Sequence, residues 1–76
     1  MDNTDELLRQ ALMRIEAIED TLGAITMAAM RQMPHGKRTG FTEAIAALAA
    51  SAEAEGDIAS ATLLTHLHAA AVHGSS

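Results

Sequence analysis

The chain has 76 residues, no cysteine, one aromatic residue (Phe41) and a formal net charge of −5. The lack of cysteine excludes disulfides and thiolate metal sites, and the negative charge argues against a general binder of nucleic acids or anionic membranes. A chain this short buries only about 60% of its unfolded surface, so a monomer is marginally stable and self-association is a common remedy.

The first expected element is a long helix over residues 4–33. Asn3 is a good N-cap, and Glu6 completes a capping box three residues later. Pro34 disfavours helix for the preceding residue and predicts the end of this element. Within it, apolar residues follow the alternating three- and four-residue spacing of a heptad repeat. The a positions hold Leu8, Ile15, Leu22 and Ala29, and the d positions hold Ala11, Ile18 and Ile25.

Residues 34–40 read Pro-His-Gly-Lys-Arg-Thr-Gly, a composition typical of a turn. A second helix is expected over residues 41–55 and a third over residues 58–73. Gly56 suits the left-handed position after a helix, and Asp57 can cap the next helix directly. Because this link is so short, the second and third helices should form an antiparallel αα-hairpin.

The last nineteen residues, 58–76, contain no aspartate, glutamate, lysine or arginine. An ordinary surface helix keeps a charged face toward water, so this segment should be covered by the other helices or by a second chain. Its leucines span too wide an arc for residues 41–55 to cover alone. The sequence therefore predicts a single all-α domain over residues 1–76, with a long N-terminal helix and a hairpin, assembled as a homo-oligomer.

The heptad pattern of residues 4–33 indicates a dimerising coiled coil. Arg14 at a g position could then meet Glu19 at an e position of a parallel partner. Alternatively, the same stripe packs on the two later helices of its own chain, although each of these is about half as long. The residues predicted for the oligomer interface are Leu8, Ile15, Ile18, Leu22, Ile25, Leu63, Leu64 and Leu67.

A second candidate surface combines three methionines with the only basic cluster. Methionine is adaptable and common on surfaces that accept partners. The cations could hold a phosphate, a nucleic-acid backbone or an acidic protein surface. Alternatively, they satisfy the C-terminal carbonyls of the first helix. The predicted partner-binding residues are Met27, Met30, Arg31, Met33, His35, Lys37 and Arg38.

The histidines and carboxylates do not suggest a metal or catalytic site. His66 and His73 are two helical turns apart, and His66 and His68 should point to different sides of their helix. The acidic residues have the spacing of the solvent face of amphipathic helices. We therefore predict no metal, no cofactor and no catalytic residue.

No glycine-rich phosphate loop, nucleophile motif or Ser-His-Asp set occurs, so the chain is not expected to be an enzyme. The expected function is a small homo-oligomeric protein-interaction module, an adaptor or an inhibitor or anti-activator of another protein, of the kind that phages and mobile elements encode. Its expected partners are a second copy and a protein target. The alternatives are a nucleic-acid-associated regulator that uses the basic turn and a structural subunit of a larger assembly.

The chain is expected in the cytoplasm, without a membrane partner. Its N-terminus, Met-Asp-Asn-Thr-Asp-Glu, is the opposite of the basic start of a signal peptide. It also lacks an uninterrupted apolar run long enough to span a bilayer.

Overall fold

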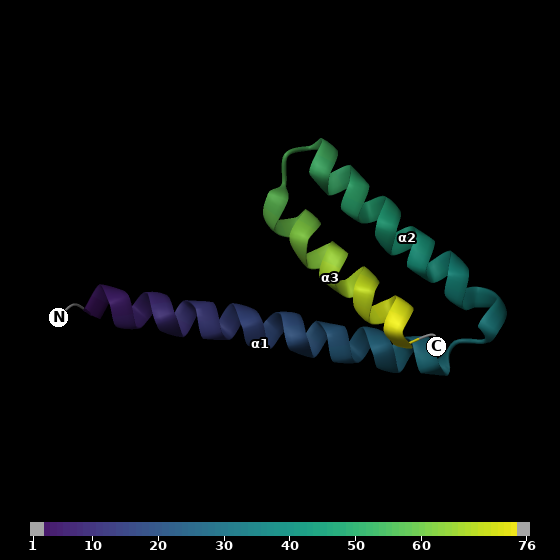
Figure 1. Cartoon of the computed structure of the whole chain (residues 1–76), viewed down its shortest axis with the longest axis horizontal. Helices are drawn as coiled ribbons and strands as arrows, with labels where there is room; N and C mark the ends of the chain where they lie inside the picture. The colour runs from purple at the N-terminus through teal and green to yellow at the C-terminus, as the bar shows by residue number, and fades with distance from the viewer. Residues whose placement is uncertain (1–2, 75–76) are drawn as a thin grey trace.

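The computed structural model describes residues 3–74, which form three α-helices: α1 (Asn3–Gln32), α2 (His35–Ala54) and α3 (Ile58–Gly74). No strand occurs between residues 3 and 74, so the predicted all-α class is confirmed. Figure 1 shows α2 and α3 side by side, running in opposite directions, with α3 between α1 and α2. Only the second half of α1 lies against this pair, and its first half projects beyond it.

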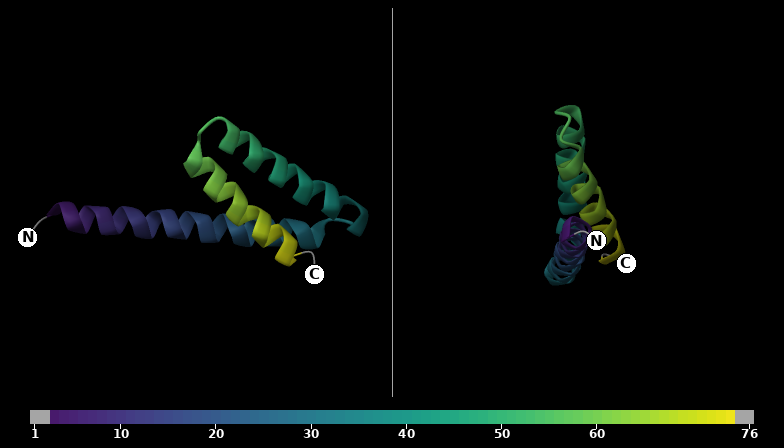
Figure 2. Two further views of the ribbon diagram at one scale, coloured as in Figure 1. Left: turned by 45° about the horizontal axis from the view of Figure 1, so that its top comes forward. Right: turned by 90° about the vertical axis from the view of Figure 1, so that its left-hand side faces the viewer.

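The three helices form a thin, elongated arrangement. It extends over 54 × 27 × 12 Å, and its shortest dimension is little more than the diameter of one helix. The edge-on view in Figure 2 shows how thin it is. The radius of gyration is 15.1 Å, whereas a compact domain of this length has about 11 Å. Because domains usually bury their core between two or more layers, a single layer leaves both broad faces open.

The core is correspondingly small and lies where the three helices meet. Among the described residues, the buried hydrophobic side chains are Met30, Ile45, Ala61 and Ala71. Met30 is the largest of them and is completely buried. Met30, Ile45 and Ala71 form one cluster, and four half-buried side chains from α2, α3 and the link between α1 and α2 pack against it: Met33, Phe41, Leu64 and Leu67.

The predicted turn over residues 34–40 is wrong, because α2 begins at His35 instead of Phe41. Pro34 (φ −59°, ψ 147°) redirects the chain within a two-residue link, and its carbonyl accepts the N–H of Lys37 at 2.9 Å to begin the helix. The Arg38 Nε donates to the carbonyl of Met33 at 3.0 Å, which ties the first turn of α2 to the link that follows α1. This side-chain bond supports a glycine-containing segment that would be a poor helix by itself.

Substitutions of two glycines test where α2 begins and ends. Gly40 lies inside α2, and a Cβ added there would have no neighbour within 4 Å. Gly40→Ala should therefore raise the free energy of unfolding by about 0.5–1 kcal/mol. Gly56 ends α2 in the left-handed region, at φ +79°, so Gly56→Ala should lower it by about 1–2 kcal/mol. Denaturant titration measures both changes. A destabilising Gly40→Ala would show that this segment is a turn after all.

Asp57 caps α3 as the sequence predicts. Its Oδ1 accepts the backbone N–H of Ser60 at 3.1 Å, and its Oδ2 accepts the Ser60 hydroxyl at 2.7 Å. The hydroxyl bond, and then the backbone bond, hold the pKa of the Asp57 carboxyl below its ordinary value of 3.8. The folded-state pKa is thus lower than the unfolded-state pKa. The cap therefore adds stability above pH 3.8 that is lost as the pH falls through the folded-state pKa.

Removing the cap should lower stability in a pH-dependent way. Asp57→Ala should lower the Tm by a few degrees at neutral pH, because the N–H groups of the first turn lose their acceptor. The difference in Tm from the original chain should narrow once the pH is well below 3.8. Thermal unfolding followed by circular dichroism measures both. The same Tm difference at every pH would show that the charge of Asp57 does not contribute.

Candidate functional site

The crossing of α1 and α3 depends on small residues and determines which face of α1 is covered. A Cβ added to Gly74 would lie 3.1 Å from the Cα of Met27, and one added to Gly23 would lie 3.5 Å from the His66 Nε2. Both glycines are buried at the contact. Because the two helices approach closely, α3 covers one face of the second half of α1 and leaves the neighbouring face exposed.

The first half of α1 has no cover from the rest of the chain. Every residue from 3 to 18 is exposed. Six large apolar side chains at a, d, e and g positions are more than half exposed, and heptad spacing places them on one side of the helix. We call them the apolar stripe: Leu7, Leu8, Leu12, Ile15, Ile18 and Ile25. Monomeric proteins rarely leave so continuous an apolar surface in water.

The stripe is hollowed beside Ile18. The hollow has a volume of about 270 Å³ and is lined by Ala17, Ile18, Thr21 and Leu22. In a coiled coil, each knob enters a hole formed by four residues of the facing helix. Here the hole would be formed by Ile18, Thr21, Leu22 and Ile25. Three of the four residues that would form such a hole therefore line this open hollow.

Two unpaired charges flank the stripe. Arg14 is exposed and Glu19 is half-buried, and neither forms an ion pair with another residue of the described chain, 3–74. By contrast, Arg9 and Glu6 lie away from the stripe at b and f positions and face each other, with Nη1 3.8 Å from Oε2. The flanks of the stripe thus carry one charge of each sign without a partner in the same chain.

The residues predicted for the oligomer interface fall into two groups. On α1, Leu8, Ile15, Ile18 and Ile25 are exposed, whereas Leu22 is half-buried. On α3, Leu63, Leu64 and Leu67 are half-buried, and the last two pack against the core of their own chain. The predicted set omits Leu7 and Leu12, although the sequence already indicates that a hairpin folded back on the first helix would leave both leucines uncovered.

The predicted partner-binding surface is partly wrong. Met30 is completely buried and belongs to the core, so it is not on a surface that a partner could contact. Met27 is half-buried against α3, and Met33 packs on the core. Three basic residues remain exposed at the junction of α1 and α2: Arg31, His35 and Lys37.

Arg38 has a structural role at this junction. Besides its bond to Met33, its Nη2 lies 3.5 Å from the carbonyl oxygen of Arg31, to which it donates, and its Nη1 lies 3.4 Å from the His35 Nδ1. A cation at this place complements the partial negative charge at the C-terminus of α1. Of the two roles considered for the basic cluster, this is the structural one, in which a cation satisfies carbonyls at the end of the first helix. Binding of nucleic acid stays a prediction, with one cation fewer available for it.

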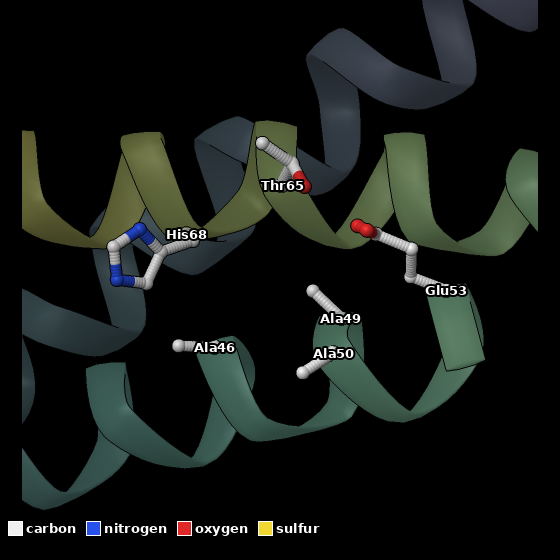
Figure 3. Close-up of a pocket in the computed structure, with 6 residues that line it drawn as sticks. All are labelled: Ala46, Ala49, Ala50, Glu53, Thr65 and His68. Carbon is white, nitrogen blue, oxygen red and sulfur yellow. The ribbon is translucent and has the colours of Figure 1, made fainter.

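A groove between α2 and α3 offers little chemistry. It has a volume of about 280 Å³ and is lined by Ala46, Ala49, Ala50, Glu53, Thr65 and His68. Figure 3 shows the alanines of α2 facing Thr65 and His68 of α3, with Glu53 extending toward α3. The Thr65 hydroxyl donates to the Ala61 carbonyl at 2.8 Å. His66 lies toward α1, so His66 and His68 are on different sides of α3 as predicted.

Within residues 3–74, no group of three or more histidine, cysteine, aspartate or glutamate side chains is placed to hold a metal ion. No helix in this range is both long enough and apolar enough to cross a bilayer. Comparison of the chain with protein-family models, with curated proteins and with solved structures gives no match.

Proposed function

We propose that the chain is a small, non-enzymatic, homo-oligomeric protein-interaction module that assembles through α1. The observation that carries this proposal is the apolar stripe, whose side chains are more than half exposed along a helix that projects from the rest of the chain. Burying a leucine or isoleucine side chain contributes about 1.5–3 kcal/mol. Pairing two stripes therefore offers a large stabilisation that the single chain lacks.

The total exposed surface supports the same proposal. The chain has 5506 Å² of accessible surface. A compact monomer of 7.9 kDa has about 4,400 Å² by the usual size scaling. The excess of roughly 1,100 Å² is comparable with the roughly 800 Å² that each partner buries in a standard interface. The surplus is thus large enough for one specific contact with another chain.

In this proposal the two parts of the chain have different tasks. The projecting half of α1 holds the oligomer together, and the body formed by α2, α3 and the end of α1 remains free. Arg31, His35 and Lys37 stay exposed on that body, away from the stripe, where they can meet an acidic protein target. This division corresponds to an adaptor or an inhibitor that presents two or more identical surfaces.

Sedimentation equilibrium over a wide range of protein concentration tests the proposal. We expect one closed species, in equilibrium with a monomer at low concentration. A monomer at every concentration would contradict the proposal. A broad distribution of masses would favour the alternative of a structural subunit, because a chain that lacks its natural neighbours associates without a fixed end point.

A further inference from the structure

We infer that two copies of the chain pair parallel and in register along residues 7–25 of α1. The inference rests on the proposed function. It adds that a second copy of α1 covers the apolar stripe and that the two helices run in the same direction. Its evidence is the distribution of charged and apolar residues beside the stripe. In coiled coils, the e and g positions border the apolar seam and determine partner and orientation.

A parallel, in-register pair satisfies the two unpaired charges. In that arrangement, each g residue faces the e residue five positions later on the second copy. Arg14 then faces Glu19 of the second copy, and by symmetry this pair occurs twice. Both side chains lack an ion-pair partner among residues 3–74 of their own chain. The second copy thus supplies the partner that the single chain does not.

The same register also matches the apolar residues at the border of the seam. One heptad before the charged pair, Leu7 at g faces Leu12 at e of the second copy. Both leucines are more than half exposed in the single chain. The a and d layers bring Leu8, Ile15 and Ile18 against their own counterparts. Farther along, the hollow beside Ile18 receives the Leu22 side chain of the second copy as a knob.

No antiparallel register achieves this pairing. In an antiparallel pair, e residues face e residues and g residues face g residues. The e positions from 5 to 26 hold no cation, being Asp5, Leu12, Glu19 and Thr26. The g positions from 7 to 21 hold no anion, being Leu7, Arg14 and Thr21. Opposite charges therefore meet across the seam only when the helices are parallel.

The parallel orientation has a consequence for the whole assembly. Because the α2–α3 unit lies at the C-terminal end of α1, a parallel pair carries both units at the same end. The two sets of Arg31, His35 and Lys37 are then presented together, and a target with two acidic sites would bind more tightly through both. An antiparallel pair would place them at opposite ends.

Spin-label distances determine the orientation. The chain has no cysteine, so Glu6→Cys, Met13→Cys and Asp20→Cys each provide one labelling site. The three sites are exposed and share the f position, one heptad apart and away from the stripe. In a parallel, in-register pair, the distance between the two labels should be the same in all three variants. In an antiparallel pair the axial separation of the labels changes by about 20 Å per heptad on either side of the centre, since a heptad rises about 10.5 Å on each helix.

The outcomes separate this inference from the proposed function. Sedimentation of the same labelled proteins gives their mass. A dimer with three equal distances supports the inference. A dimer with unequal distances overturns the orientation but leaves the proposed function standing. A mass of three or more copies overturns the pairing of two chains but also leaves the proposed function standing. A monomer overturns both.

Charge reversal tests the pairing of Arg14 with Glu19. Arg14→Glu should weaken the dimer several-fold, because each of two attractive pairs becomes repulsive. Adding Glu19→Arg should restore the original dissociation constant. Met13→Glu, which adds a negative charge at an exposed f position away from the stripe, is the control and should leave the dissociation constant unchanged. A double variant as weak as Arg14→Glu alone would contradict the pairing.

Discussion

Ile18→Asp should convert the dimer into a monomer and raise its dissociation constant at least about a hundredfold, equivalent to about 2.7 kcal/mol. Ile18 is 58% exposed in the single chain and lies at a d position of the stripe. In the dimer, each substituted copy loses about 1.5–3 kcal/mol of apolar burial. It also places an unpaired carboxylate against the second helix, which costs further free energy. Sedimentation equilibrium measures the change.

Met13→Asp is the matched control for this substitution. Met13 is 64% exposed, as accessible as Ile18, but its f position lies on the opposite side of α1. The same charge introduced there should leave the dimer intact. If Ile18→Asp also remained a dimer with the original dissociation constant, the apolar stripe would not be the contact surface.

Dissociation should reduce helicity only in the projecting half of α1. Residues 3–18 make no contact with the core, and an isolated helix of this length is marginal in water. The body around Met30 does not depend on Ile18 and should keep its helices. The Ile18→Asp monomer should therefore show less helical circular dichroism than the dimer, but not the signal of an unfolded chain.

Met30→Ala should lower the free energy of unfolding by about 2–5 kcal/mol. Met30 is the largest fully buried side chain and lies in the cluster that joins the three helices. Truncating it removes apolar contacts and leaves a cavity. Native domains are stable by only about 5–15 kcal/mol, and a chain with so small a core belongs near the lower limit. A large fraction of the variant should therefore be unfolded near body temperature.

Met13→Ala is the control for the loss of a methionine. Its side chain is exposed and contacts no core residue, so the change in stability should lie within about 0.5 kcal/mol. Thermal unfolding at one fixed protein concentration compares the two variants, since the Tm of an oligomer depends on concentration. Equal Tm values for both would show that Met30 does not anchor the three helices.

The limits of α1 and α3 could be predicted because local residues determine them. Pro34 ends one helix, Gly56 provides a positive φ, and Asp57 caps the next. Each prediction lies within one residue of the observed limits. These signals act on neighbouring backbone groups, so they can be recognised without knowledge of the tertiary structure.

The start of α2 could not be predicted in this way. Gly36 and Gly40 give residues 34–40 the composition of a turn, and local propensity favours that interpretation. The structure adds a bond that this composition does not reveal, in which the Arg38 Nε donates to the carbonyl of Met33 in the link before α2. Residue propensities describe the backbone alone, so they contain no direct signal for this side-chain bond.

The candidate site could be predicted only in part, for a similar reason. The heptad spacing identified the apolar face of α1, but it does not show that α3 packs on the neighbouring face, around Gly23, Met27 and Met30. The crossing at Gly23 and Gly74 determines this, and it buries Met30 while leaving Ile18 and Ile25 exposed. Methionine clusters are compatible with a surface or a core, and here one of three methionines is core.

The most direct test of the apolar stripe as the oligomer interface is hydrogen exchange of residues 7–18, measured across a range of protein concentrations. If α1 pairs with a second copy there, exchange of these amides should slow in proportion to the fraction of dimer, because pairing stabilises an otherwise marginal helix. Amides around Met30 should respond much less. Fast exchange of residues 7–18 at concentrations where sedimentation shows a full dimer would contradict the account and place the interface elsewhere.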